Sequence, residues 1–164
     1  MKRASGVLMH VSSLWGDHSE GSFGEAARQW IDFLSECGFS YWQTLPFCMT
    51  DWVNSPYKSY SSFGGKPYFI DLEELAAEGL LSYPELQSAK QRTPYSCEFE
   101  RLRVERLQLL RAASDRVSDD KKANIDKFIN ENPYLEQVCR FMALKEANNQ
   151  ESWLNWTTDK YDDG

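Results

Sequence analysis

Residues 39–46 read FSYWQTLP, a run of aromatic and apolar side chains that begins after Gly38 and ends at a proline. A short run of this kind predicts a buried β-strand. Residues 6–11, GVLMHV, predict an earlier strand of the same type. Between the two runs, residues 26–37 carry apolar side chains at helical spacing, so we expect a βαβ unit whose two strands run parallel.

Several of the expected helices have recognisable capping residues at their ends. Ser22 and Glu25 have the spacing of a capping box before the first helix, and Gly38 stands where a helix C-cap belongs. Asp71 is placed to cap a short helix that Gly79 closes. These signals predict the helix boundaries without any reference to tertiary contacts.

The second half of the chain has a helical pattern. Ser82 and Glu85 repeat the capping-box spacing, and amphipathic stretches follow over residues 98–117, 119–131 and 134–147. We expect their apolar side chains to face inward and the arginines of the first stretch to form a solvated face. The inward set is Phe99, Leu102, Leu109, Ala113, Ile125, Phe128, Ile129, Leu135, Val138, Cys139 and Met142, and the arginines are Arg101, Arg103, Arg106 and Arg111.

Aromatic rings alternate with hydroxyls, glycines and prolines after the second strand. Residues 54–71 read NSPYKSYSSFGGKPYFID. Rings beside hydrogen-bonding groups suit a ligand with apolar faces and polar edges, such as a sugar. The stretch equally fits an aromatic loop that packs on its own domain. In a βαβ unit ligands bind beyond the carboxyl ends of the strands, where His10 and this stretch are expected.

Composition limits the classes of function. The 164 residues are 41% hydrophobic and 26% charged, which predicts a globular, soluble protein. The net charge of −7 argues against nucleic acid as a partner, and no apolar run is long enough to span a membrane. The four cysteines lack the close spacing of a zinc or redox motif, and no nucleotide fingerprint is present. We therefore expect reduced thiols in a cytoplasmic protein without metal or cofactor.

Three motifs together resemble the start of the amylomaltases, which are 4-alpha-glucanotransferases also called disproportionating enzymes. The motifs are R-x-SGVL-x-H-x-SSL at positions 3–14, SYWQ-x-LP at 40–46 and SPY-x-S-x-S-x-F-x-G-x-P-x-x-IDL at 55–72. They stand in the family's order and close to its spacing over residues 3–80. A weaker similarity returns at FMALK, residues 141–145, and at W-x-x-W, residues 153–156.

The resemblance implies a TIM-type (β/α)8 barrel and retaining transfer of α-1,4-glucan segments by double displacement. Such chemistry uses two carboxyl groups about 5 Å apart, and the family's catalytic acids lie beyond position 164. A whole barrel needs roughly 200 residues or more, so we expect an α/β fold in which the barrel is incomplete. Residues 1–80 would start the barrel with two strands, a helix and a substrate loop. Residues 81–164 would form a mostly helical subdomain and a Trp-containing tail.

The resemblance also suggests individual site residues for α-1,4-glucans such as maltodextrins. Ser55 and Tyr57 match family positions that line the sugar site near the reacting bond. Trp52 matches a position that the family uses in a second glucan-binding site. His10 fits either a hydrogen-bonded structural group or a residue close to the substrate. The chain departs from the family pattern at Trp15, which replaces a proline, and within residues 17–20 and 48–54.

The carboxylates near this region are not expected to supply a catalytic pair. Asp71 is explained as a helix cap, and Glu73, Glu74 and Glu78 as a solvated helix face. Asp17, Glu20 and Asp51 are the other nearby acids. Two hypotheses follow: the chain is part of an α-glucan transferase and inactive alone, or it is a non-catalytic glucan-binding or structural fragment.

Overall fold

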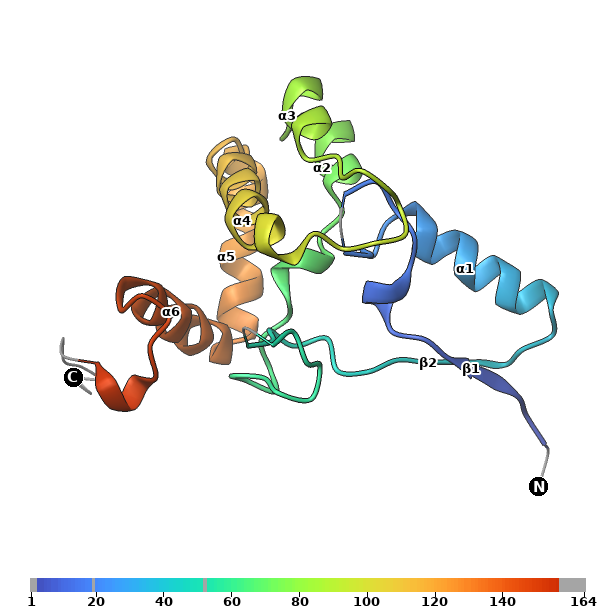
Figure 1. The fold of residues 1–164 in the computed structure, drawn as a ribbon. Helices are drawn as coiled ribbons and strands as arrows, with labels where there is room; N and C mark the ends of the chain where they lie inside the picture. Colours follow the sequence, from blue (N-terminus) through green and yellow to red (C-terminus); the bar gives the residue numbers. More distant parts are fainter. Residues whose placement is uncertain (1–2, 19, 52, 157–164) are drawn as a thin grey trace.

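The βαβ unit predicted for the first part of the chain is present in the structure. The computed structural model describes residues 3–18, 20–51 and 53–156. Strands β1, Gly6–Leu8, and β2, Tyr41–Gln43, pair in parallel, with Gly6 opposite Tyr41 and Leu8 opposite Gln43. Helix α1, Glu25–Glu36, connects them (Figure 1).

Both strands are shorter than the apolar runs that predicted them. After Leu8, the Met9 N–H still donates to the Gln43 carbonyl, at 3.0 Å, and the Met9 carbonyl accepts from Trp42 Nε1, at 2.7 Å. The chain then turns into a short 3-10 helix, η1, at Val11–Ser13. Val11 is fully buried there, so the end of the run packs as a core residue rather than extending the sheet.

The capping box predicted at Ser22 and Glu25 is wrong. The N-cap of α1 is Gly24, and the Ser22 hydroxyl instead donates to Asp71 Oδ2, at 2.5 Å. A Cβ at Gly24 would lie 1.9 Å from that same oxygen, so only glycine allows this close approach. The prediction failed because a tertiary partner, distant in sequence, takes the serine hydroxyl.

The other predicted caps are confirmed. Asp71 accepts the Glu74 N–H at the start of α2, Leu72–Ala77, and Ser82 and Glu85 form a capping box on α3, Tyr83–Ser88. Gly38 and Gly79 both have φ of 76° and follow the ends of α1 and α2, as a left-handed C-cap requires. The remaining elements are η2, Pro67–Phe69; α4, Phe99–Asp115; α5, Asp119–Glu131; α6, Tyr134–Ala147; and η3, Trp153–Asn155.

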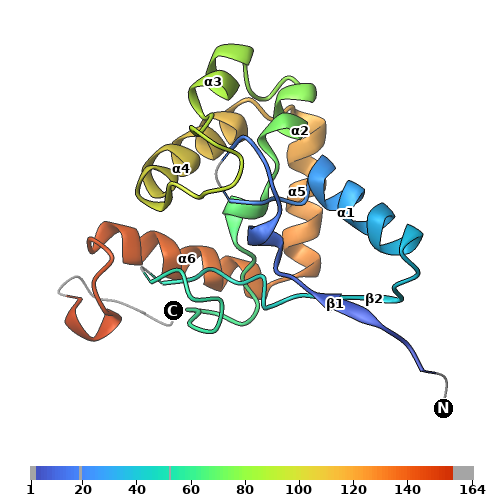
Figure 2. The ribbon, with the colours of Figure 1, turned by 45° about the vertical axis from the view of Figure 1, so that its right-hand side comes forward.

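Two small apolar clusters hold these elements together. The first joins Val11 and Leu14 to Ala27 of α1 and Phe69 of η2. The second gathers the buried residues Leu72, Leu80, Leu81 and Ala113, from α2, the loop after it and α4. Figure 2 shows the βαβ unit on one side and helices α3, α4 and α6 on the other, with the segment around η2 between them.

Several side chains differ in burial from the prediction. Cys139 of α6 was predicted to face inward but is exposed. Ile125, Phe128 and Ile129 of α5 are exposed, because no described element covers their side of the helix. Arg106 was predicted on a solvated face but is only 3% exposed. Its guanidinium donates to the main-chain oxygens of His18, at 2.6 Å, and Ile70, at 3.3 Å, which recovers part of the cost of burying a charge.

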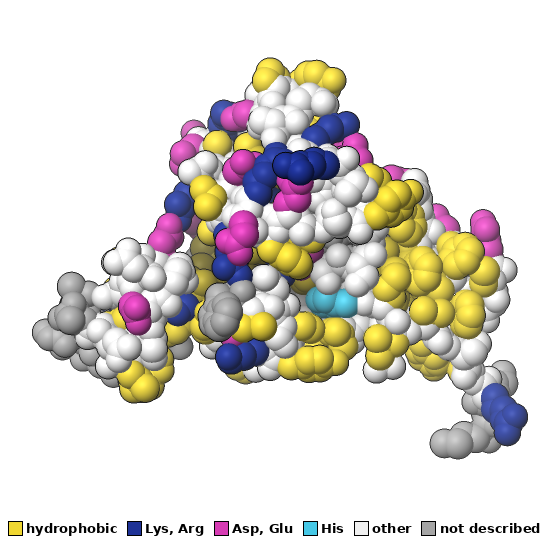
Figure 3. Space-filling model, viewed as in Figure 1, with side chains coloured by type: hydrophobic (Ala, Val, Ile, Leu, Met, Phe, Trp, Pro, Cys, Tyr) yellow, Lys and Arg dark blue, Asp and Glu magenta, His cyan; other side chains and the backbone are white. Residues whose placement is uncertain are grey.

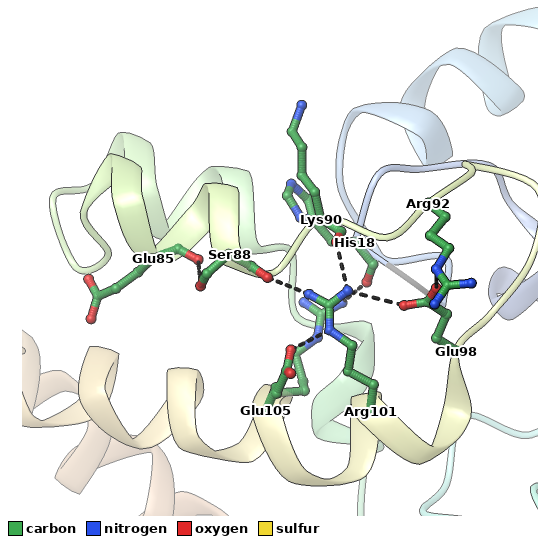
Figure 4. A network of polar contacts seen from close by, with 9 residues as sticks. His18, Glu85, Ser88, Lys90, Arg92, Glu98, Arg101 and Glu105 are labelled. Carbon is green, nitrogen blue, oxygen red and sulfur yellow. Dashed lines mark hydrogen bonds and ion pairs between the residues drawn. The ribbon is translucent and has the colours of Figure 1, made fainter.

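Arg101 also has a structural role that the sequence pattern did not indicate. It donates to the main-chain oxygens of Ser88, the last residue of α3, and of Lys90, the latter at 2.7 Å (Figure 4). Glu98, the N-cap of α4, and Glu105, within α4, accept from the same guanidinium at 3.1 and 2.5 Å. Arg101 thus satisfies carbonyl groups at the end of α3 and fixes that helix against α4.

Apolar side chains are also exposed on the surface of the molecule. In Figure 3 they gather over the region of α1, where Ile31 and Phe33 are each 51% exposed. Within the described part of the chain, none of the helices combines the length and the apolar character needed to cross a bilayer.

Asp71 is expected to be important for stability. Asp71→Ala should lower the free energy of unfolding by about 1–2 kcal/mol, because it removes the cap of α2 and the acceptor of Ser22. Asp71→Asn should lose less, since its amide oxygen still accepts from the Glu74 N–H. Urea denaturation followed by circular dichroism measures both, and an unchanged midpoint for Asp71→Ala would contradict this role.

Candidate functional site

The aromatic stretch after β2 forms an ordered loop whose two ends meet. The Lys66 N–H donates to the Phe47 carbonyl, at 2.8 Å, and Cys48 bridges to Gly65 in antiparallel fashion. A second antiparallel bridge, from Thr50 to Ser59, closes the middle of the loop. The described residues between 47 and 66 are therefore held by main-chain hydrogen bonds and not only by side-chain packing. We call residues 47–66 the substrate loop, after the role expected from the sequence.

A turn at residues 51–58 forms the tip of the substrate loop. Asp51 Oδ1 accepts from the Val53 N–H, at 2.9 Å, and Asp51 Oδ2 pairs with Lys58, at 3.0 Å. Burial raises the pKa of Asp51, but these two hydrogen bonds outweigh it, and the pKa lies below its ordinary value. Asn54 has φ of 59°, in the left-handed region that asparagine tolerates better than most residues. The charged pair thus stiffens the turn.

Two of the predicted sugar-binding residues lie on this tip. Tyr57 is 76% exposed, and Ser55 is half-buried. Neither side chain makes a hydrogen bond with a described residue, so a ring and a hydroxyl are presented on a fixed turn. Trp52, the third residue predicted on the substrate loop, lies outside the described residues.

His10 lies at the base of the substrate loop rather than at its tip. Its ring stacks on Phe47, with centroids 5.9 Å apart, and meets the edge of Phe69, at 5.4 Å. Nδ1 is buried and has no hydrogen-bond partner among the described residues. Burial, reinforced by the charge of Lys66, lowers the pKa of His10, so the ring is neutral at pH 7. No ring contact or hydrogen bond within the described residues joins His10 to Ser55 or Tyr57.

A buried ion pair, which the sequence did not indicate, lies beneath His10. Lys66 Nζ is 2.6 Å from Glu20 Oε1, and both side chains are almost completely buried. The ammonium also lies 5.3 Å from the centroid of Phe69 and 5.5 Å from that of Tyr68. Burial outweighs the attraction of Lys66 and raises the pKa of Glu20. Glu20 therefore anchors the substrate loop to the loop after β1 and is not presented to a ligand.

The substrate loop and α6 enclose a pocket of about 280 Å³. Tyr60 of the loop faces Phe141 of α6, with centroids 6.3 Å apart, and Phe63 faces Tyr134, at 5.7 Å. A Cβ at Gly64 would lie 2.7 Å from Val138, so the loop approaches the helix closely. The pocket thus has aromatic walls from two segments far apart in sequence.

Sequence reasoning missed the α6 side of this pocket, because it assigned the stripe of α6 to packing. The faint similarity at residues 141–145 was the one available signal. Lys145, within that segment, is buried and places Nζ 4.6 Å from the centroid of the Tyr60 ring, which ties α6 to the substrate loop.

The acids near the substrate loop have structural partners. Asp17 pairs with Lys90, at 2.9 Å, Glu20 with Lys66 and Asp51 with Lys58, while Asp71 caps α2. Among the described residues no group of three or more His, Cys, Asp or Glu side chains is arranged to hold a metal ion. The thiols of Cys37, Cys48, Cys97 and Cys139 are free.

Comparison with known proteins relates the chain to one group of enzymes. A family model described as 4-alpha-glucanotransferase matches residues 9–163. The 4-alpha-glucanotransferase of Streptococcus pneumoniae serotype 4 is 39% identical over 160 residues, covering 94% of this chain and 31% of the relative. That of Thermus thermophilus is 33% identical over 157 residues, covering 95% of this chain and 31% of the relative. The chain therefore spans about a third of the length of the curated relatives it matches.

A solved structure gives the same result. The structure of the amylomaltase from Streptococcus agalactiae in complex with acarbose superposes on this chain with a TM-score of 0.90, and the two sequences are 32% identical. The match covers 96% of this chain and 32% of that chain.

The Glu20–Lys66 pair is expected to be essential for stability. Lys66→Met should cost about 3–5 kcal/mol or unfold the chain, because Glu20 would keep a buried, unpaired carboxylate. The double variant Glu20→Leu, Lys66→Met should recover most of this loss. Arg111→Met breaks the exposed pair with Glu146 and serves as the control, and its unfolding midpoint should stay close to that of the unaltered chain. Urea denaturation of the four proteins decides, and equal losses in the single and double variants would contradict the assignment.

Stability is expected to fall as the pH drops through 6.5. Burial is the main cause that lowers the pKa of both His10 and His18 below 6.5 in the fold. The unfolded chain therefore binds more protons than the folded chain in this range, and protonation favours unfolding. His10→Phe keeps a ring on Phe47 and removes both the titration and the unpartnered Nδ1. It should retain stability at pH 7 and reduce the pH slope; an unchanged slope would show that His10 does not contribute.

Proposed function

Because the chain belongs to the 4-alpha-glucanotransferase family, we propose that it is part of an enzyme that moves α-1,4-glucan segments between glucan chains. The observation that carries this proposal is the superposition of 96% of the chain on an amylomaltase that was solved with acarbose. Residues 1–80 would provide the start of the (β/α)8 barrel together with the substrate loop. Residues 81–164 would provide the helical insertion beside it. We propose a cytoplasmic location.

The proposed reaction is a retaining double displacement. A carboxylate attacks the anomeric carbon of the donor glucan while a carboxylic acid protonates the leaving glycosidic oxygen. A hydroxyl of the acceptor glucan then attacks the anomeric carbon and displaces the carboxylate. The residue that served as the acid in the first step now acts as the base and takes the proton of that hydroxyl. Both catalytic residues would come from outside this chain, in keeping with the structural partners of Asp17, Glu20, Asp51 and Asp71.

The role proposed for this chain is to bind and position the glucan. The exposed Tyr57 ring would stack on the apolar face of a sugar, and the Ser55 hydroxyl would bond to its polar edge. His10, at the base of the substrate loop, is neutral and would add no charge of its own there. Trp52 stays a prediction from the family resemblance alone.

Activity is tested best in a chimera. Residues 1–164 would replace the matching third of the S. agalactiae amylomaltase, and maltotriose disproportionation would be followed by glucose release. We expect activity from the chimera and none from the 164-residue chain alone. If the whole exchange fails to fold, exchange of residues 47–66 alone tests the substrate loop. A folded chimera that binds acarbose without turnover would favour the non-catalytic alternative.

Tyr57 is the residue to test within an active chimera. Tyr57→Ala should lower the rate at least tenfold, about 1.4 kcal/mol of barrier, whereas Tyr57→Phe keeps the ring and should lose less. Tyr83→Ala removes a tyrosine of similar exposure from α3 and is the matched control. Equal kinetics for Tyr57→Ala and Tyr83→Ala would remove Tyr57 from the site.

A further inference from the structure

A groove of about 550 Å³ lies between the loop after β1 and the loop that precedes α4. Ser12, Ser13 and Trp15 line one wall, and Tyr95, Ser96 and Cys97 line the other. None of these residues belongs to the substrate loop or to the pocket beside α6. The groove is large enough for part of an oligosaccharide.

The two walls are fixed to each other by several interactions. The Gln91 N–H donates to the Asp17 carbonyl, at 2.8 Å, and the Gly16 N–H donates to the Pro94 carbonyl, at 3.4 Å. Lys90 and Asp17 form an ion pair, at 2.9 Å. Both ribbon views show the loop before α4 running beside the loop after β1 (Figures 1 and 2). The groove is thus a built feature in which two distant segments are joined.

Two aromatic side chains are exposed along the groove. Tyr95 is 87% exposed and Trp15 is 41% exposed. Neither ring stacks on another ring of the described chain. An exposed indole and phenol offer flat apolar faces with a polar end, the combination that suits the face of a sugar ring.

The polar groups of the groove are uncharged and available. The hydroxyls of Ser12, Ser13 and Ser96 make no hydrogen bond with a described residue. Burial raises the pKa of the Cys97 thiol to about 12, so it is neutral. Acidic side chains close to the groove are each paired with a base: Asp17 with Lys90, at 2.9 Å, Glu98 with Arg101, at 3.1 Å, and Glu20 with Lys66, at 2.6 Å. Rings and hydroxyls without net charge favour a neutral polyhydroxylated ligand over a phosphate, a carboxylate or a cation.

We propose that this groove binds an α-1,4-glucan chain, with Trp15 and Tyr95 as stacking platforms and the serine hydroxyls as hydrogen-bonding groups. The choice of an α-glucan rests on the proposed function, whereas the choice of a neutral sugar rests on the groove itself. Trp15 stands where the chain departs from the family pattern, so this platform is a property of this sequence.

The test is calorimetric titration of the 164-residue chain with maltoheptaose. Trp15→Ala and Tyr95→Ala should each weaken binding at least about fivefold, and Trp15→Phe, which keeps a ring, should lose less. Trp153→Ala and Tyr83→Ala remove exposed rings of the same types elsewhere and should leave binding unchanged. Since Tyr95 is almost fully exposed, its variant tests the groove even if Trp15→Ala does not fold.

Tyr57→Ala, measured in parallel, separates this proposal from the proposed function. Loss only with Tyr57→Ala would overturn the groove and leave the substrate loop intact. Loss with Trp15→Ala and Tyr95→Ala but not with Tyr57→Ala would support the groove and count against Tyr57. Absence of maltoheptaose binding by the unaltered chain, or equally tight binding of the β-linked cellohexaose, would overturn the groove as an α-glucan site.

Discussion

The buried ion pair between Glu20 and Lys66 is the interaction on which the candidate site depends. Two opposite charges, 2.6 Å apart and out of contact with solvent, are stable only together, because either one alone would be buried without compensation. Lys66 also closes the substrate loop through its N–H, which donates to the Phe47 carbonyl. The position of the substrate loop is therefore fixed from below by the loop after β1. The same positive charge helps to keep His10 neutral.

Charged groups also join the two apolar clusters. Arg106 reaches from α4 to the carbonyls of His18 and Ile70, and Asp71 accepts from Ser22 while it caps α2. Both apolar clusters are small, so directional hydrogen bonds between them define how the βαβ unit sits against the helices. Burial lowers the pKa of Arg106 to about 10, which still leaves it charged at neutral pH and able to hold both carbonyls.

Features with a local cause could be predicted from the sequence, and features with distant partners could not. The structure confirms the caps at Asp71 and Ser82, the left-handed conformation of Gly38 and the parallel βαβ unit. The caps and Gly38 depend on residues close by in sequence, and the βαβ unit follows from the spacing of apolar residues. The Glu20–Lys66 pair spans 46 positions and the Arg106–His18 contact spans 88, so no periodicity indicates them. The family was likewise predictable because its motifs are local, whereas the pocket beside α6 required the fold.

The acids near the loops serve to hold the loops in place. Asp17, Asp51 and Glu20 each face a lysine, so the acids near the loops stabilise loop positions and are not left free to exchange protons with a substrate. The surfaces between these pairs then carry rings and hydroxyls: Tyr57 and Ser55 on the tip, Tyr60 and Phe141 beside α6, and Trp15 and Tyr95 along the groove. The proposed ligand, a glucan, carries no charge, and its rings and hydroxyls would match what these surfaces offer. Ion pairs that fix the loops thus leave aromatic rings and hydroxyls on the surfaces between them, as the proposed binding of a long neutral polymer requires.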